Sequence, residues 1–193
     1  VRVSHGLADG KEYSVGTNDR EVSAEMTGYL ASLGHQRIAF ITGHRLHKAV
    51  AFRLDGYKDG LQQAGLEYRD DYVVAGDNSI GSGEQCAEQL LTLSPRPTAI
   101  FSANDDMAAG VMRVATRMNI KVPDELSIAG CDDIPLARQI YPALTTIKQP
   151  LVSMAETASL ALINTTRGHT PKHGVEIIPG EIQVRQSTGP APK

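Results

Sequence analysis

Short runs of consecutive apolar residues alternate along this chain with longer stretches in which apolar residues recur every three or four positions. The short runs predict strands at residues 38–42, 72–75, 99–102 and 126–130. They show little alternation between apolar and polar positions, so both faces of each strand should be covered. Such strands are typical of a parallel sheet with helices on each side.

The stretches between these strands have the spacing of amphipathic helices, at residues 22–33, 48–64, 82–93 and 106–118. Thr17, Asn18 and Asp19 supply residue types that cap helix N-termini, and Gly34 and Gly65 are typical helix stops. Strands that alternate with helices of this length indicate right-handed βαβ units. The predicted fold is therefore α/β, with a doubly wound parallel sheet.

Beyond Pro142 the pattern changes. Residues 144–147, 175–178 and 182–185 read as short extended segments, residues 152–164 as a helix, residues 168–174 as a loop and residues 189–193 as a frayed tail. An extended segment at residues 13–16 precedes the first helix. One helix with a few strands is too little to close a second core, so these segments should belong to a neighbouring lobe.

Composition and charge exclude several classes of function. The formal net charge is −3 with a pI near 6.1, and no basic block offers a surface for the phosphate backbone of nucleic acid. No apolar run is close to the length of a membrane span, which is about 20 residues. Residues 1–12 lack the apolar core of a secretion signal. Cys86 and Cys131 have no partner at metal-ligand spacing and read as buried reduced thiols, which favours the cytoplasm.

Polar side chains follow each of the predicted strands, and in an open α/β sheet these positions meet at one edge, where ligands bind. They include Arg53 in the helix after the first strand, Asp77 and Asn78 after the second, Asn104 and Asp105 after the third, and Asp132 and Asp133 after the fourth. Carboxylates and carboxamides accept from hydroxyls, and a guanidinium donates parallel bonds. Together they suit a polyhydroxylated or carboxylated small molecule.

Each of these residues also has a structural interpretation. Asn104 or Asp105 could be a helix N-cap, Asp132 and Asp133 could form a turn, and Arg53 could be a surface arginine. Asp132 and Asp133 could alternatively hold Mg²⁺ in a phosphoryl-handling enzyme. The sequence lacks nucleotide-binding glycine motifs, a zinc-protease motif and a nucleophile elbow, so we expect no enzyme, no cofactor and no metal.

Six stretches, in order along the chain, resemble the effector-binding part of the lactose/galactose repressor (LacI/GalR) family of bacterial transcription regulators. They are residues 33–41 (LGHQRIAFI), 52–57 (FRLDGY), 103–110 (ANDDMAAG), 128–133 (IAGCDD), 144–150 (LTTIKQP) and 184–188 (VRQST). The resemblance implies a type I periplasmic-binding-protein-like fold with two α/β lobes and an effector between them. It implies one complete C-terminal lobe at residues 17–143 and 181–188, with remnants of the N-terminal lobe at 1–16 and 150–180.

By this resemblance Arg53, Asn104 and Asp132 correspond to effector contacts of the C-terminal lobe. Asp77 or Asn78 and Gln149 become secondary contacts, and Thr17 becomes a wall residue. Asn78 stands where relatives place an aromatic side chain, so a sugar effector is one expectation among related metabolites. The DNA-reading helix-turn-helix and most of the first lobe are missing from the sequence.

Family members pair through their lobes, so the resemblance also implies a homodimer. The candidate dimer face consists of Ala109, Met112, Arg113, Ile140 and Tyr141, with internal packing of Met112 and Ile140 as the alternative. Residues 151–163 would expose apolar surface if their lobe were absent. The alternative function is a solute-binding protein that feeds a transporter, which shares the lobe fold.

Overall fold

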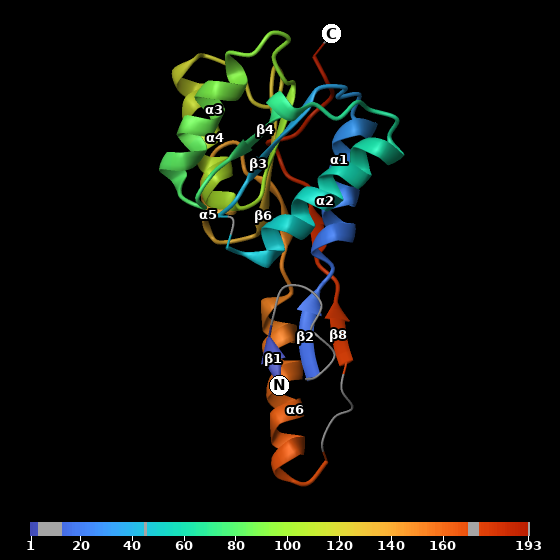
Figure 1. Ribbon diagram of the computed structural model, residues 1–193. Coiled ribbons are helices and arrows are strands. Elements are labelled where there is room, and N and C mark those ends of the chain that lie inside the picture. The colour runs from blue at the N-terminus through green and yellow to red at the C-terminus, as the bar shows by residue number, and fades with distance from the viewer. Residues whose placement is uncertain (4–12, 45, 170–173, 193) are drawn as a thin grey trace.

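The structure, a computed structural model, describes residues 1–3, 13–44, 46–169 and 174–192. The described elements form a six-stranded sheet flanked by helices and a three-stranded sheet beside one long helix (Figure 1). The larger sheet has the order β4-β3-β5-β6-β7-β9 and consists of β3 (Ile38–Thr42), β4 (Val73–Ala75), β5 (Ala99–Ser102), β6 (Ser127–Asp132), β7 (Thr145–Lys148) and β9 (Glu181–Gln183). Its strands are parallel except β9, which pairs antiparallel with β7.

Helices cover both faces of the larger sheet, as the uninterrupted apolar strands predicted. The helices α1 (Asp19–Ser32) and α2 (Lys48–Gln63) lie on one face, and α3 (Ile80–Leu91) and α4 (Asp105–Arg117) lie on the other (Figure 1). Each pair packs closely at glycines. A Cβ at Gly56 in α2 would lie 2.1 Å from the carbonyl oxygen of Arg20, and one at Gly83 would lie 2.3 Å from that of Met107. The helix pairs therefore have fixed positions above the sheet.

The core of the larger unit is built around stacked aromatic side chains. The rings of Phe40 and Tyr57 stack with centroids 5.0 Å apart, and Phe101 meets Phe40 edge-on at 5.1 Å. The buried Tyr57 hydroxyl donates to the carbonyl oxygen of Ile38 at 2.8 Å. This ring cluster ties α2 to the middle of the sheet, and so it fixes where the residues of α2 stand relative to the strand ends.

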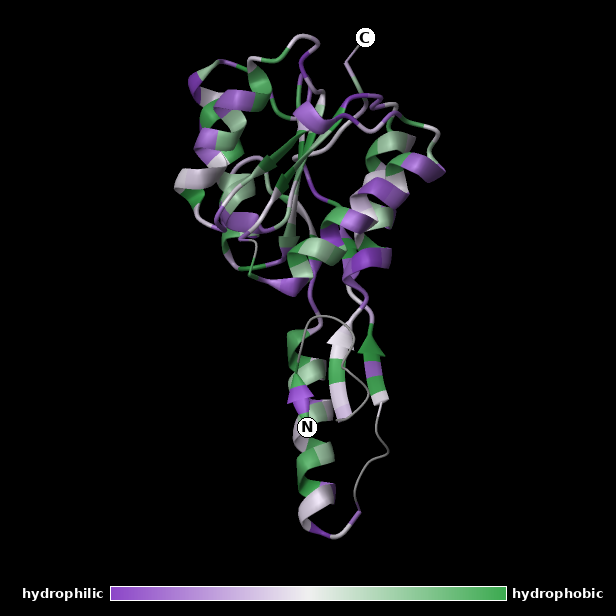
Figure 2. Ribbon diagram, viewed as in Figure 1, coloured by the Kyte–Doolittle hydropathy of each residue, from purple (hydrophilic) through white to green (hydrophobic). Residues whose placement is uncertain are grey.

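The smaller sheet contains β1 (Arg2–Val3), β2 (Tyr13–Thr17) and β8 (Gly174–Ile178), all parallel, with α6 (Leu151–Thr166) packed on it. Its buried apolar cluster consists of Val15, Met154 and Ala158. Much of α6 is apolar, as Figure 2 shows along the helix. The exposed apolar residues of α6 are Leu151, Val152, Leu160, Leu162 and Ile163. The fold is therefore α/β, with one complete lobe and part of a second.

Three chain segments connect the two units. They lie between β2 and α1, between β7 and α6, and between β8 and β9. Asn18 does not cap α1 with its side chain, contrary to the interpretation of the cluster at residues 17–19. Its Oδ1 instead accepts a hydrogen bond from the Gly180 backbone N–H at 2.8 Å. The first and third connections are thereby tied to each other.

Several predicted boundaries were wrong in detail. Tyr72 belongs to the 3₁₀ helix η1 (Asp70–Tyr72), where its hydroxyl donates to the carbonyl oxygen of Pro95 at 2.7 Å. The helix α3 begins at Ile80 because the Ser79 side chain caps it by accepting from the Ser82 N–H. The strand β1 and the short helix α5 (Leu136–Gln139) were not predicted. Residues 170–173 of the predicted loop and Lys193 of the predicted tail lie outside the described residues.

Candidate functional site

The predicted site residue Arg53 lies at the carboxyl ends of the strands, where it joins three elements. Its Nε donates to Asp19 Oδ1 at 2.9 Å, and its Nη1 donates to the carbonyl oxygen of Ala103 at 2.5 Å. Its Nη2 donates to Asp132 Oδ1 at 3.3 Å. The residue is only 6% exposed, so the interpretation as a surface arginine is wrong. Arg53 therefore connects the start of α1, the loop after β5 and the end of β6.

Charge compensation makes this burial possible. An isolated guanidinium would lose its hydration, and burial alone would lower the pKa of Arg53. The neighbouring carboxylates of Asp132 and Asp19 more than reverse this effect, and the pKa of Arg53 is raised above its ordinary value. The guanidinium thus stays charged between two carboxylates. The Cys131 thiol beside it stays neutral, because burial raises its pKa.

Asp19 also belongs to this cluster, and sequence reasoning did not select it as a candidate site residue. Its Oδ1 also accepts from Gln149 Nε2 at 3.3 Å, and the same Gln149 nitrogen lies 3.4 Å from Cys131 Sγ. The Gln149 Oε1 atom is buried and has no hydrogen-bond partner among the described residues. Asp19 follows a strand of the smaller sheet, a signal that could have marked it. It was interpreted only as part of a helix-capping cluster.

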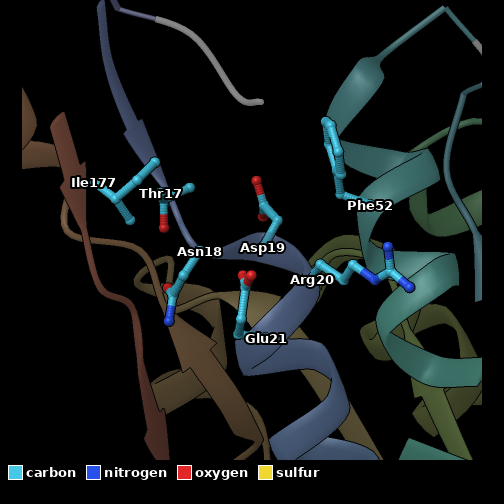
Figure 3. Close-up of a pocket in the computed structure, with 7 residues that line it drawn as sticks. All are labelled: Thr17, Asn18, Asp19, Arg20, Glu21, Phe52 and Ile177. Atoms are coloured by element: carbon cyan, nitrogen blue, oxygen red, sulfur yellow. The ribbon is translucent and has the colours of Figure 1, made fainter. Parts of the chain in front are cut away.

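A pocket of about 280 Å³ opens beside this cluster (Figure 3). Its lining residues are Thr17, Asn18, Asp19, Arg20, Glu21, Phe52 and Ile177. In Figure 3 the Asp19 carboxylate stands between Thr17 and the Phe52 ring, while the Arg20 guanidinium is turned away toward α2. There Arg20 pairs with Asp59 at 2.6 Å. Thr17 is 5% exposed, and its hydroxyl has no hydrogen-bond partner within the described ranges.

The two consecutive aspartates after β6 have different partners. Asp132 faces Arg53, whereas both carboxylate oxygens of Asp133 are taken by arginines, Arg185 at 2.5 Å and Arg138 at 2.8 Å. Burial favours the neutral form of Asp133, but these guanidinium groups lower its pKa below the ordinary value. This pairing places two guanidinium groups at the carboxylate that the Mg²⁺ alternative assigned to the ion. Among the residues that the structure describes, no group of three or more acidic, histidine or cysteine side chains could hold a metal ion.

Asn104 is the N-cap of α4, as the structural interpretation of this residue predicted. Its side chain accepts from the Met107 N–H at 3.0 Å, and its Nδ2 donates to the carbonyl oxygen of Asn78 at 2.9 Å. Asn78 has a left-handed backbone, with φ of 76°, and its Oδ1 accepts from the His44 N–H at 3.4 Å. These contacts join the loops after β3, β4 and β5 at the same edge of the sheet.

The side chain of Asp77 forms hydrogen bonds within its own loop. Its carboxylate is exposed and accepts from the backbone N–H and the hydroxyl of Ser79, at 2.9 and 2.5 Å. The Ser79 hydroxyl, followed by the Ser82 hydroxyl and the Ser79 backbone N–H, lowers the pKa of Asp77 to about 2. The contacts close the loop in front of α3. Asp77 therefore has a local structural role in addition to any contact with a ligand.

The five residues of the predicted dimer face differ in how far they are buried. Ala109 and Met112 are 5% and 7% exposed, and both are buried within the larger unit. Ile140 is half-buried against the same core, so the alternative of internal packing describes Met112 and Ile140. Tyr141 is 95% exposed, and the exposed Arg113 pairs with Glu84 at 3.1 Å. Only Arg113 and Tyr141 of the five are well exposed in the single chain. The helix α4, which carries Ala109 and Met112, packs against α3, α5, β5 and β6.

Comparison with known proteins identifies the class. Residues 27–188 match a family described as the periplasmic binding protein-like domain, in agreement with the fold and with polar groups at the carboxyl ends of the strands. The structure of the Escherichia coli transcriptional repressor ascG is similar, with a TM-score of 0.88 and 30% identity, and the match covers 97% of this chain and 68% of that one. A CelR–cellobiose complex has a TM-score of 0.89 at 28% identity, covering 96% and 57% of the two chains. The chain belongs to the LacI/GalR family of transcriptional regulators and carries its periplasmic-binding-protein-like domain.

Curated relatives are repressors of the same kind. The HTH-type transcriptional repressor CytR of Escherichia coli is 35% identical over 168 residues, which are 87% of this chain and 49% of the relative. The ribose operon repressor of Escherichia coli is 41% identical over 138 residues, 72% of this chain and 42% of the relative. The chain thus spans about half the length of these relatives. Within the described residues, no helix has the length and apolar character needed to cross a membrane.

Proposed function

We propose that the chain is the ligand-sensing part of a LacI-type bacterial transcription regulator. A small hydroxyl-rich effector, a sugar or related metabolite, binds beside Arg53 and controls DNA binding by a helix-turn-helix that this sequence does not contain. The observation that carries the proposal is the buried Arg53, which lies between the carboxylates of Asp19 and Asp132 at the carboxyl ends of parallel strands. Ligands of open α/β sheets bind at this edge.

The chemistry of the cluster suits a molecule with several hydroxyl groups. Such a ligand can accept from the Arg53 guanidinium and donate to the carboxylates of Asp19 and Asp132. Gln149 Oε1 and the Thr17 hydroxyl, both buried without a described partner, would gain hydrogen bonds. A buried polar group that lacks its hydrogen bond costs about 1–3 kcal/mol, so the ligand relieves a cost that the unliganded site carries.

The remaining predicted contacts fall around this centre. We assign direct contact to Arg53, Asp132 and Asn104, with Thr17 at the end of β2 and Gln149 on the connection between β7 and α6. Asp77 and Asn78 are secondary contacts on the neighbouring loop. Because Asp19 begins α1 directly after the first connection and Gln149 lies in the second, a ligand that binds there changes the relative angle of the two lobes. This angle is the signal to the DNA-binding part.

Further properties follow from the same proposal. The regulator acts in the cytoplasm as a homodimer without catalytic activity, and Tyr141 and Arg113 lie on its dimer face. A transporter-linked solute-binding protein is the competing function. The curated relatives and solved neighbours described above are transcription regulators, which favours the regulator.

The proposal is tested by a thermal-shift screen of sugars, nucleosides and purines against the full-length protein that carries this sequence. A ligand at a hundredfold its Kd should stabilise the folded state by about 2.7 kcal/mol, which raises Tm by several degrees. Operator DNA in a gel-shift assay should then respond to the same ligand. A ligand that binds tightly without changing operator binding would contradict the regulatory role.

Replacement of Asp132 by asparagine should weaken effector binding about tenfold, or about 1.4 kcal/mol, because a charged acceptor bonds more strongly than an amide. The measurement is isothermal titration calorimetry with the ligand that gives the largest thermal shift. The matched control is Asp71→Asn, since Asp71 is exposed and pairs only locally with Arg69. Equal affinities of the original protein and the Asp132→Asn variant would remove Asp132 from the effector contacts.

A further inference from the structure

The turn that follows β6 has an unusual backbone. Asp132 has φ of 116° and Asp133 has φ of 53°, and both angles lie in the left-handed region that favours glycine. Two consecutive non-glycine residues keep such a conformation only where their surroundings impose it. The residue that this turn presents to Arg53 is Asp132, one of the proposed effector contacts. The groups that hold the turn therefore decide where the Asp132 carboxylate lies.

The first of these groups is the carboxylate of Asp133, a residue whose side chain is only 2% exposed. Arg185 Nη2 donates to Asp133 Oδ1 at 2.5 Å, and Arg185 Nη1 donates to the carbonyl oxygen of Leu144 at 2.7 Å. Arg185 follows β9, and Leu144 precedes β7. The Arg185 guanidinium thus connects the turn after β6 to the segments that flank β7 and β9. Arg138 donates to the other oxygen of Asp133 at 2.8 Å, but from an exposed position.

The second group is Asp105, the first residue of α4, which is 1% exposed. Its Oδ2 accepts from the Ile134 backbone N–H at 2.9 Å, and its Oδ1 accepts from the Thr146 hydroxyl at 2.5 Å. A Cβ at Gly130 would lie 2.4 Å from Asp105 Oδ1, so this carboxylate lies directly against β6. The turn is thereby held at Ile134 by α4 and β7, and at Asp133 by Arg185.

We infer that Asp133, Arg185 and Asp105 are positioning residues of the effector site. They hold the left-handed turn in the conformation that directs Asp132 toward Arg53, and they do not need to contact the ligand. The inference rests on the proposed function only where it concerns ligand affinity. The position of Asp132 relative to Arg53 can be measured in the unliganded chain.

The test compares Arg185→Ala with Arg138→Ala, because each variant removes one guanidinium from the same carboxylate. Crystal structures of both variants give the distance from Arg53 Nη2 to Asp132 Oδ1, which is 3.3 Å in the unchanged chain. We expect Asp132 to move beyond hydrogen-bond distance in Arg185→Ala and to stay in place in Arg138→Ala. Hydrogen exchange of the Ile134 amide should accelerate only in Arg185→Ala. If Asp132 stays at Arg53 in a folded Arg185→Ala chain, or moves equally in both variants, the inference is overturned.

Two further variants keep the test decisive if Arg185→Ala does not fold. Arg185→Lys retains the positive charge but cannot donate to Asp133 and Leu144 in the same fork geometry, so it should displace Asp132 partially. Thr146→Val removes the hydroxyl that anchors Asp105 and should also accelerate exchange of the Ile134 amide. An unchanged Asp132 position and unchanged amide exchange in both variants would overturn the inference.

Ligand binding supplies an independent measurement. Calorimetric titration of the full-length protein uses ribose and cellobiose, which are bound in two similar solved structures. For a sugar that binds, affinity should fall about tenfold in Arg185→Ala and remain unchanged in Arg138→Ala. Equal affinities in these two variants would contradict the positioning role. If neither sugar binds the unchanged protein, that result counts against a sugar effector in the proposed function, and the crystal comparison still decides the positioning role.

Discussion

Replacement of Arg53 by methionine should destabilise the chain by about 3–5 kcal/mol and abolish effector binding. The substitution keeps most of the side-chain volume but removes the positive charge between Asp19 and Asp132, together with the hydrogen bond to the Ala103 carbonyl. Breaking a buried ion pair costs this much because the remaining charge stays buried without compensation. Urea unfolding followed by circular dichroism measures the loss, with the midpoint and slope fitted separately.

Two comparisons separate the charge effect from general damage to α2. Arg20→Met removes an exposed ion pair with Asp59, and it should leave the unfolding midpoint unchanged. The double variant Arg53→Met with Asp19→Asn should be more stable than Arg53→Met alone, because the second change removes one uncompensated carboxylate. If the double variant is the less stable of the two, the cost of Arg53→Met does not come from unpaired charge.

The larger lobe could be predicted from the sequence because its strands are short, apolar and buried on both faces. Residues 38–42 and 99–102 lie in strands with the predicted bounds, since no polar residue interrupts the apolar runs. Tyr72 was assigned to a strand because its ring is apolar, but its hydroxyl reaches the Pro95 carbonyl and the backbone there is helical. Such a contact between distant residues leaves no trace in local periodicity.

The candidate site could be predicted only in part, because local spacing shows which residues follow a strand but not which distant residues pair with them. The spacing after each strand brought Arg53 and Asp132 to one edge, and the two side chains are in contact there. Whether Arg53 was a surface or a cleft residue depended on Asp19, which lies 34 residues earlier and was interpreted as a cap. Arg185 lies 52 residues from Asp133, so their pairing could not be read from spacing. Periodicity also cannot show that Ala109 and Met112 are buried within the larger unit.

A pH dependence of stability should arise at Asp105. Burial raises the pKa of this carboxyl to about 7, although hydrogen bonds from Thr146 and Ile134 act in the opposite direction. In the unfolded chain an aspartate has a pKa near 3.9, so between about pH 4 and pH 7 the folded state holds a proton that the unfolded state has lost. The Asp105 contribution to the free energy of unfolding should therefore fall by about 1.4 kcal/mol per pH unit as pH rises through this window.

The Asp105→Asn variant tests this dependence, because an amide has the shape of the protonated carboxyl and does not titrate. Burial lowers the pKa of His35, which gives a slope of the opposite sign below about pH 6.5, so the useful quantity is the difference between the two proteins. Urea unfolding of both from pH 4.5 to pH 8 should show that difference shifting in favour of Asp105→Asn as pH rises, and levelling off above about pH 7. Parallel stability curves over the whole range would mean that Asp105 is ionised throughout, and that its hydrogen bonds and the N-terminus of α4 stabilise the charge more than burial opposes it.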